Sequence, residues 1–369
     1  MLPPKTRLAT PYYRLLRRLW RLGPAPARQL LRELDFSKTV GGRLMDQMAH
    51  EGVAGLDENQ NLRILGSYGT VLGLHMGTRT VSAALVNFTG ELLLSEDFPY
   101  PVGSPLVQAV VQSVRAMERF LRSPDMPPLR GVALSLPGIV DPYRLVLLRS
   151  KPLGIEQPLD LKETLGRILG RPLTAENDAN CCCWGEAAVQ RHRKLGNFLF
   201  LLAERRPYSA GEPLPVLPAF SIGSGLYLNG SVYHGTRFSA GEFQSIFKGG
   251  PEQRNQFSVT DEQMTRALVD PAVEEEIARE LSRNAALLVN TLNLDRVFVS
   301  WPRQEMQQRV VEILRDEIQR NWSYEYPVDC TVELPVMGRL APAYGAAGLH
   351  LESLYQTADG TAPYFPGKN

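Results

Sequence analysis

The sequence predicts an α/β protein that begins with a small, mostly helical unit. Its 369 residues are enough for two or three domains at roughly 100–200 residues each. Hydrophobic residues make up 44% of the chain, which excludes an intrinsically disordered protein. From Thr70 onward, segments with strand periodicity alternate with segments of helical periodicity, and this alternation indicates an α/β body.

The residues before Thr70 predict three helices and a hairpin. The helices are predicted over 13–22, 27–34 and 37–51, and the hairpin over 56–65. Gly23 and Pro24 end the first helix, and Ser37 is a suitable N-cap for the third. Three helices and a hairpin are the plan of a winged helix-turn-helix unit.

The body is predicted to contain more than one sheet. Strands are predicted over 71–74, 81–86, 92–96, 131–136, 173–175, 198–202, 220–228 and 296–300. Helices are predicted over 106–121, 161–169, 270–292, 303–320 and 344–355. Asp270 as N-cap and Pro271 at the first position start the longest of these helices. A proline-rich excursion over 205–217 is interpreted as a surface loop, with a protein-contact surface as the alternative.

Charge is distributed unevenly along the chain. Residues 1–65 hold 11 Lys/Arg and 6 Asp/Glu, whereas the remaining residues hold 29 and 33. A basic N-terminal unit on a mildly acidic body is typical of a nucleic-acid-binding unit joined to another domain. An Arg-rich, solvated helix surface would give the same balance, so charge alone leaves both interpretations open.

Cysteine usage and hydropathy exclude several classes of protein. The four cysteines are Cys181, Cys182, Cys183 and Cys330, and no CxxC pair is present, so the sequence gives no support for a structural zinc site. The N-terminus lacks an uninterrupted apolar segment, and no apolar run is long enough to span a membrane. We therefore expect a soluble, cytoplasmic protein.

Three motifs carry a resemblance to a known family. They are Ala175-Glu176-Asn177-Asp178-Ala179-Asn180, Ile222-Gly223-Ser224-Gly225-Leu226-Tyr227-Leu228-Asn229-Gly230 and Ser239-Ala240-Gly241-Glu242. In this order and spacing they resemble the ROK family (repressor, open reading frame, kinase), and in particular its transcriptional regulators. The alternative is an unrelated α/β protein. The resemblance implies a winged helix-turn-helix followed by a two-lobed body of the actin-ATPase or sugar-kinase fold.

The resemblance also implies a division of the chain. The predicted parts are a DNA-binding domain over 1–65, a linker over 66–69, a first lobe over 70–180 and a second lobe over 181–340. Residues 341–369 would form a C-terminal helix that returns to the first lobe, followed by a tail.

The resemblance implies a sugar site at Asn177, Asp178 and Glu242. A carboxylate and an amide side by side suit a polyol because each can engage two hydroxyls. Asp178 stands at the position of the base in the family's kinases. The alternative interpretation of Asp178 is an N-cap for the helix that follows it.

The nucleotide site departs from the family's kinases at two places. His75 stands where those kinases carry an aspartate, and imidazole is a poor substitute for a hard oxygen ligand of Mg²⁺. Ser300 and Trp301 replace paired glycines that let a nucleotide approach the backbone. The loops with Gly77, Thr78, Gly223, Ser224 and Gly225 would then be vestigial phosphate loops, although glycines in a sheet turn are the alternative for the second loop. We expect no catalytic residue and no ATP or Mg²⁺ cofactor.

The family's zinc loop is missing as well. Ser245 stands where relatives carry a zinc-binding histidine, and no cysteine follows it before Cys330. We therefore expect no bound metal, and the three consecutive cysteines are interpreted as packed small hydrophobes.

The expected DNA contacts lie on the third helix and in the hairpin. They are Lys38, Thr39, Arg43, Gln47 and Arg63. Gly41 and Gly42 occupy positions where relatives carry polar side chains, and glycine within a helix is unfavourable.

Together these features predict a sugar-responsive, DNA-binding transcriptional regulator without kinase activity. DNA, a sugar or sugar derivative and a second copy of the chain would be its partners, because a homodimer can bind two half-sites. Two alternatives remain: an ATP-dependent sugar kinase with an inherited DNA-binding unit, and a decayed dimeric regulator that lacks specific DNA binding.

Overall fold

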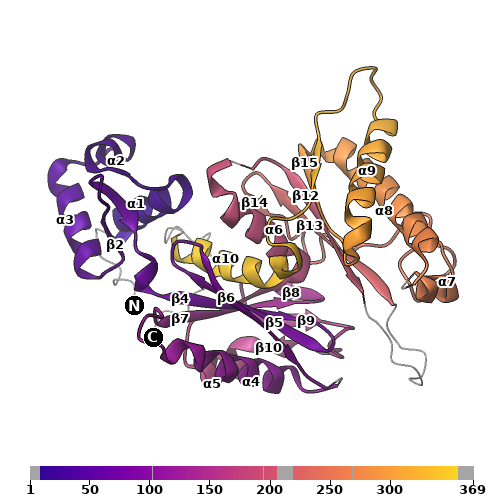
Figure 1. The fold of residues 1–369 in the computed structure, drawn as a ribbon, viewed down its shortest axis with the longest axis horizontal. Coiled ribbons are helices and arrows are strands. Elements are labelled where there is room, and N and C mark those ends of the chain that lie inside the picture. The colour runs from indigo at the N-terminus through magenta and orange to yellow at the C-terminus, as the bar shows by residue number, and fades with distance from the viewer. Residues whose placement is uncertain (1–8, 102, 194, 206–218, 268, 356–369) are drawn as a thin grey trace.

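The computed structural model describes residues 9–355 except 102, 194, 206–218 and 268. Most of the excursion predicted at 205–217 therefore lies outside the described residues. The chain has three parts, an N-terminal head and two lobes, which lie next to one another in Figure 1. Each of the two lobes is built on a five-stranded sheet. No helix of the described part combines the length and the apolar composition that crossing a membrane requires.

The head is a winged helix-turn-helix, as the sequence predicts. Its elements are α1 (Ala9–Leu22), β1 (Ala25–Pro26), α2 (Ala27–Glu33), α3 (Lys38–His50), β2 (Ala54–Leu56) and β3 (Asn61–Ile64). The three strands form a small antiparallel sheet in the order β1-β3-β2. Ser37 caps α3, because its hydroxyl accepts a hydrogen bond from the Val40 amide at 3.2 Å.

The segment predicted as a linker is ordered. It forms a short 3-10 helix, η1 (Gly66–Tyr68). The Tyr68 ring lies 4.9 Å from that of Phe88, and the Arg130 guanidinium lies 4.6 Å from the Tyr68 ring centroid. These contacts attach the end of the head to the first lobe.

The first lobe is built on the sheet β11-β7-β4-β5-β6. Its strands are β4 (Thr70–Met76), β5 (Thr80–Asn87), β6 (Leu92–Pro99), β7 (Leu129–Leu136) and β11 (Leu173–Asn177). Strands β4, β7 and β11 are parallel, whereas β4, β5 and β6 form an antiparallel meander. Helix α4 (Leu106–Glu118) packs on one face and α10 (Ala341–Tyr355) on the other.

Smaller elements complete the first lobe. Strands β8 (Ile139–Asp141), β9 (Val146–Arg149) and β10 (Leu159–Asp160) form a short antiparallel sheet. The helix predicted over 161–169 differs from expectation, because it begins with a π-helical turn, η3 (Lys162–Gly166), before α5 (Arg167–Leu169). A 3-10 turn, η2 (Phe120–Arg122), extends α4.

The second lobe is built on the sheet β14-β13-β12-β15-β16. Its strands are β12 (Phe198–Arg205), β13 (Phe220–Leu228), β14 (Ser231–Val232), β15 (Arg296–Ser300) and β16 (Thr331–Glu333). Helices α7 (Asp261–Arg266), α8 (Pro271–Leu292) and α9 (Gln304–Arg320) share a hydrophobic core with one face. Asp270 caps α8 and Pro271 is its first residue, as predicted.

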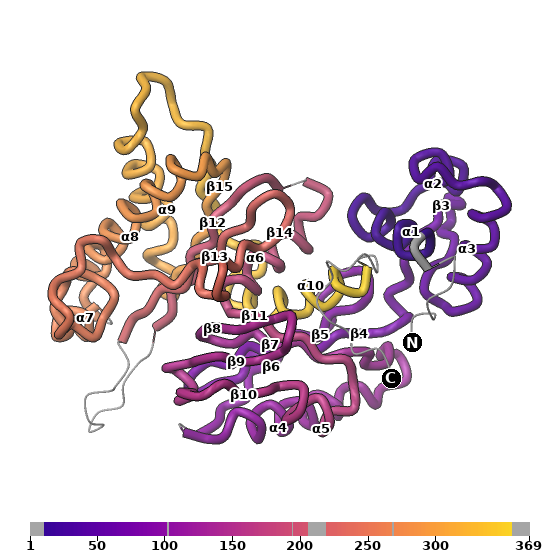
Figure 2. Tube along the Cα trace, turned by 180° about the vertical axis from the view of Figure 1, so that it is seen from behind, coloured from indigo at the N-terminus to yellow at the C-terminus, as the bar shows by residue number. Residues whose placement is uncertain are grey.

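Helices α6 (Asp178–Val189) and α10 pack together between the two sheets, as Figure 2 shows from behind. A Cβ atom on Gly345 would lie 1.8 Å from the Cys181 carbonyl oxygen, so only glycine permits this approach. The three cysteines of α6 are fully buried here, in agreement with their interpretation as small hydrophobes. Because α6 begins immediately after β11, its N-terminus lies where the two lobes meet.

Candidate functional site

A cleft between the two lobes contains the predicted sugar-binding residues. The cavity has a volume of about 470 Å³, and Asn177, Asp178 and Glu242 all line it. The first lobe contributes the turn after β7 and the junction of β11 with α6, and the second contributes β12, β13 and the loop that carries Glu242. The tertiary structure therefore brings together three side chains that come from separate motifs.

Asp178 is the first residue of α6 and is 6% exposed. One carboxylate oxygen accepts a hydrogen bond from the Ala179 amide at 2.8 Å. Burial, followed by the negative charge of Glu204, raises the pKa of Asp178 to about 7, although nearby His75 opposes this shift. A carboxyl group with this pKa can accept or release a proton near neutral pH.

Asn177 is the N-cap of α6, a role that the sequence interpretation considered for Asp178. Its side-chain oxygen accepts from the Asn180 amide at 3.1 Å, and its side-chain nitrogen donates to the Gly138 carbonyl at 3.0 Å. These bonds hold the β11–α6 junction against the turn after β7. Asn177 thus positions the helix and lines the cleft at once.

His75 connects the two lobes at the base of the cleft. Its Nδ1 lies 3.1 Å from the Ser135 hydroxyl of β7, and its Nε2 lies 3.3 Å from a carboxylate oxygen of Glu204 on β12. Burial alone would lower the pKa of His75, but the hydrogen bond and charge of Glu204, together with Asp178, raise it. The His75–Glu204 pair therefore occupies the position where the family resemblance implies a metal-organising aspartate.

A second histidine–glutamate pair also joins the lobes, but here the second lobe provides the histidine and the first lobe provides the glutamate. His234, after β14, lies 2.6 Å through its Nε2 from the carboxylate of Glu176 on β11. Glu176 also accepts from the Asn177 amide at 2.8 Å and from the Asn180 side chain at 3.2 Å. Burial would lower the pKa of His234, but the contact with Glu176 raises it.

Glu242 is placed by a close contact between two glycine-containing segments. The Ser224 hydroxyl donates to the Gly241 carbonyl at 2.7 Å, and the Ser224 amide donates to the same oxygen at 3.2 Å. Gly241 has φ +90°, and a Cβ there would lie 1.9 Å from the Ser224 carbonyl oxygen. Partial desolvation in the cleft raises the pKa of Glu242, and Lys151 counteracts this shift.

Four cations line the same cleft. They are Arg149, Lys151, Lys248 and Arg254. None of the four makes an ion pair with another described residue. With the carboxylate of Glu204 paired to His75, they give the cleft a net positive charge.

The two segments predicted as phosphate loops adopt different conformations. Gly77 and Thr78 form the tight turn between β4 and β5, where the Gly77 amide donates to the Thr80 carbonyl at 3.0 Å. Gly223, Ser224 and Gly225 lie within strand β13 and not in a loop. Gly225 has a packing role, because a Cβ there would lie 2.6 Å from both the Ala179 carbonyl oxygen and the Cys183 sulfur. Neither Gly223 nor Gly225 has a positive φ, so the alternative of a glycine-dependent sheet turn is not found either.

Trp301 packs into the core of the second lobe. Its ring lies 4.9 Å from that of Phe220, and its Nε1 donates to Glu274 of α8 at 2.7 Å. Ser300 ends β15 immediately before it. The indole fills the space between the end of β15 and the start of α8, and it does not line the cleft.

The described residues contain no group of three or more His, Cys, Asp or Glu side chains that could hold a metal ion. Ser245, at the position of the family's zinc-binding histidine, is buried, and its hydroxyl accepts from the Asn284 side chain at 3.1 Å. This loop is thus held by hydrogen bonds between neutral side chains.

The head exposes most of the residues predicted to contact DNA. Lys38, Thr39 and Arg43 on α3 and Arg63 on β3 are exposed. Gln47 is partly buried, and its amide donates to Glu51 at 2.9 Å.

The two glycines of α3 differ in environment. A Cβ at Gly41 would lie 1.9 Å from a methyl group of Leu31 on the neighbouring segment, whereas nothing lies within 4 Å of a Cβ at Gly42. Gly41 therefore has a packing role at the contact of α2 with α3.

The fold and motifs described above agree with a match to a family model. The model described as ROK family matches residues 71–205. Residues 71–205 are therefore similar to the ROK family.

Both kinases and a repressor are among the proteins similar to this chain. A β-glucoside kinase of Listeria innocua is 31% identical over 121 residues, which are 33% of this chain and 36% of that kinase. A xylose repressor of Caldicellulosiruptor bescii is 20% identical over 220 residues, 57% of this chain and 51% of the repressor. The matched segments thus span about a third to a half of the length of these curated relatives.

The fold matches over nearly the whole chain. The crystal structure of a ROK family transcriptional regulator, a homologue of the E. coli MLC protein, has a TM-score of 0.72 at 14% identity. The match covers 94% of this chain and 96% of that one, so the head and both lobes are included. The fold is therefore a winged helix-turn-helix followed by a two-lobed body of the actin-ATPase type.

Two contacts between the lobes were not predicted from the sequence. Glu204 is the first acidic residue after the apolar run 198–203, and this change of polarity at a strand end was a usable signal. The pairing of His234 with Glu176 gave no such signal: Glu176 lies in the first motif, but its partner is 58 residues further along the chain and belongs to none of the three motifs.

Proposed function

We propose that the chain is a DNA-binding transcriptional regulator that responds to a sugar or sugar derivative and has no kinase activity. The observation that carries the proposal is the basic face of α3, where Lys38, Thr39 and Arg43 are exposed together. Phosphate and base contacts require cationic and polar side chains on one accessible helix face. The xylose repressor relative and the regulator-like fold support the same assignment.

The ligand would bind in the cleft, with Asn177, Asp178 and Glu242 as its polar contacts. Because Arg149, Lys151, Lys248 and Arg254 also line the cavity, we expect the ligand to carry an anionic group in addition to its hydroxyls. Ligand binding would change the closure of the lobes and so the position of the head. The parts of the chain would be those expected from the sequence, and the active form would be a homodimer.

DNA binding by the full-length protein tests the regulator function. The DNA would come from around the protein's own gene, with random DNA as the comparison, and the affinity would be measured at several salt concentrations. Arg43→Gln should weaken binding and reduce the salt slope by about one. Arg115→Gln, an exposed arginine of α4, is the matched control and should have no effect.

The outcomes distinguish a sequence-specific regulator from a dimeric regulator that has lost specific DNA binding. Preference for the DNA around the gene, changed by a sugar or sugar phosphate, supports the proposal. A steep salt slope without preference over random DNA would indicate that only contacts to the DNA backbone survive. Equal affinities for Arg43→Gln and Arg115→Gln would contradict the assignment of α3.

One observation favours a sugar kinase as the second candidate. Asp178 combines the position of the kinase base with a pKa near 7, and a β-glucoside kinase is among the relatives. His75 opposes this function, because its pairing with Glu204 replaces an oxygen ligand for Mg²⁺. Incubation with hexoses and β-glucosides, ATP and Mg²⁺ should give no ADP above background. ADP formation that Asp178→Asn abolishes would establish the kinase instead.

A further inference from the structure

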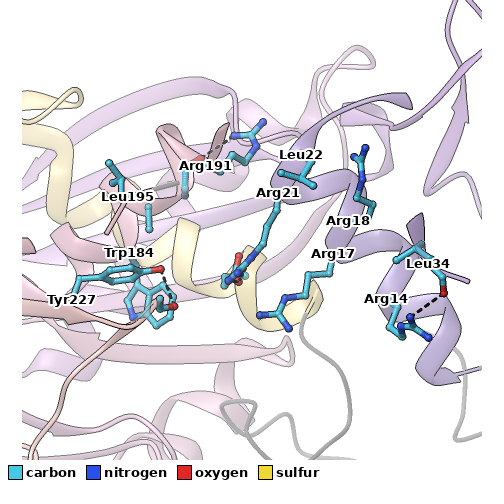
Figure 3. Close-up of a pocket in the computed structure, with 14 residues that line it drawn as sticks. Arg14, Arg17, Arg18, Arg21, Leu22, Leu34, Trp184, Arg191, Leu195 and Tyr227 are labelled. Carbon is cyan, nitrogen blue, oxygen red and sulfur yellow. Dashed lines mark hydrogen bonds and ion pairs between the residues drawn. The ribbon is translucent and has the colours of Figure 1, made fainter. Parts of the chain in front are cut away.

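A second cavity lies between the head and the body, away from the cleft. It has a volume of about 650 Å³, within the usual range of small-molecule sites. Helix α1 of the head forms one wall, and α6, the turn between β13 and β14, and α10 form the other. Figure 3 shows the side chains of Arg17 and Arg21 extending from α1 toward this second wall.

The head side of this cavity is strongly cationic. Four arginines of α1 line it, Arg14, Arg17, Arg18 and Arg21, and Arg191 of the body adds a fifth; Glu352 is the single acidic residue in the lining. Arg21 pairs with Glu352, and Arg18 pairs with Glu33 outside the lining. Even with both pairs counted as neutral, three guanidinium charges remain. An anion bound among these arginines would reduce their mutual repulsion.

Arg17 is the cation with the fewest partners. It makes no hydrogen bond or ion pair with another described residue, whereas Arg14 donates to the Leu34 carbonyl and Arg191 to the carbonyls of Ala188 and Thr89. Arg17 and Arg21 both act on Tyr227 across the cavity, lowering its pKa, although burial dominates and raises it to about 12. The Arg17 guanidinium is thus available to a ligand.

The body side of the cavity is apolar and aromatic. Trp184 and Tyr227, 6% and 5% exposed, pack edge-to-face with ring centroids 5.9 Å apart. Ala187 and Leu195 extend this surface. The Trp184 Nε1 donor is buried and has no hydrogen-bond partner among the described residues. An apolar wall opposite a row of arginines favours a ligand that is both apolar and anionic.

We propose that this cavity binds a small amphiphilic organic anion, with an aromatic or alicyclic body against Trp184 and Tyr227 and a carboxylate or similar group on Arg17. A nucleic-acid phosphate fits less well, because it would leave the apolar wall uncovered. The bound anion contacts the head and the body at once, so it fixes the head relative to α6. Helix α6 carries Asp178 of the cleft at its other end, which links the two sites through one rigid element.

The experiment compares two fluorescent probes that differ in charge. The anion 1-anilinonaphthalene-8-sulfonate and the neutral N-phenyl-1-naphthylamine share their ring systems, and both would be titrated against the full-length protein. We expect one anion per chain, bound at least about tenfold more tightly than the neutral probe. Arg17→Gln should weaken binding of the anion about tenfold and leave the neutral probe unchanged. Arg17→Lys should retain much of the affinity.

Two further variants locate the binding. Ala187→Phe places a ring in the cavity and should weaken both probes, whereas Arg115→Gln on α4 should affect neither. Circular dichroism would confirm that each variant is folded. The proposal is overturned if the two probes bind equally, if Arg17→Gln behaves like Arg115→Gln, or if Ala187→Phe leaves both affinities unchanged. These outcomes do not depend on sugar or DNA binding, so they test this cavity separately from the proposed function.

Discussion

His75, Asp178 and Glu204 form one buried group of charges whose net charge depends on pH. The folded state raises the pKa of Asp178 to about 7 by burial and by the charge of Glu204. The folded protein therefore keeps a proton that the unfolded chain releases from about pH 4 upward. The contribution of Asp178 to the free energy of unfolding must therefore fall as the pH rises through this interval, and it levels off above pH 7. The raised pKa of His75 acts in the same direction at higher pH.

Asp178→Asn removes this titration and should stabilise the protein at neutral pH. The free energy of unfolding of the variant should exceed that of the unchanged protein, and the difference should grow by on the order of 2–4 kcal/mol between pH 4 and pH 7. Above pH 7 the difference should stay constant. Urea unfolding at pH 4.5, 6 and 8 measures the gain. Asp316→Asn, on an exposed position of α9, is the control and should change stability by less than about 0.5 kcal/mol. A gain that is the same at every pH would contradict the assignment.

Helices α6 and α10 touch along glycines, and this contact sets the positions of both ends of α6. At Gly345 the Cys181 carbonyl oxygen occupies the space of a side chain. At Gly348 the fit is looser, because a Cβ would lie 3.0 Å from that of Ala188. The helices must therefore move apart to admit a methyl group at Gly345, and Asp178 would move with α6.

Two glycine-to-alanine substitutions in helices should have opposite effects. Gly345→Ala should destabilise the protein by about 2–3 kcal/mol, because the added methyl group meets backbone. Gly42→Ala should stabilise it by up to about 1 kcal/mol, because the methyl group meets open space and alanine favours a helix. Thermal unfolding measures both changes. A rise in Tm for both variants would show that α6 and α10 can separate without cost.

At the scale of the whole molecule, contacts between α1 and α10 attach the head to the body. Trp20 of α1 donates to Glu352 at 2.9 Å, and Arg21 pairs with the other carboxylate oxygen. The Trp20 ring packs 5.1 Å from Tyr355, and the Arg191 guanidinium lies 4.4 Å above it. Because Glu352 is buried, its hydrogen bonds contribute more than those of a surface ion pair.

Glu352→Gln should loosen the head without unfolding the lobes. Loss of the charge should increase amide hydrogen exchange in α1 about fivefold to thirtyfold, which corresponds to about 1–2 kcal/mol, and leave α8 unchanged. Mass spectrometry of peptides from the full-length protein measures this exchange. Glu312→Gln is the control, because Glu312 pairs with Arg309 on the exposed surface of α9. Equal exchange of α1 in the two variants would show that this joint does not hold the head.

Much of the site could be predicted from motifs, but its charge balance could not. Asn177, Asp178 and Glu242 were recognisable from local sequence, and they line one cleft. His75 was recognised as a departure from the family's kinases, whereas its partner Glu204 lies 129 residues further along the chain. The pKa of Asp178 depends on this partner and on burial, and neither is a property of the local sequence.

The sequence by itself determined the order of the elements, the helix caps at Ser37 and Asp270 and the resemblance to the ROK family, because periodicity, capping and motifs are local in the chain. The tertiary structure decided which side chains meet. It placed the arginines of α1 against the body, where Arg21 pairs with Glu352 and the arginines line a cavity, although the sequence alone allowed them to be a solvated or a DNA-binding face. Such contacts join residues that are hundreds of positions apart, so only the packing of the head on α6 and α10 could establish them.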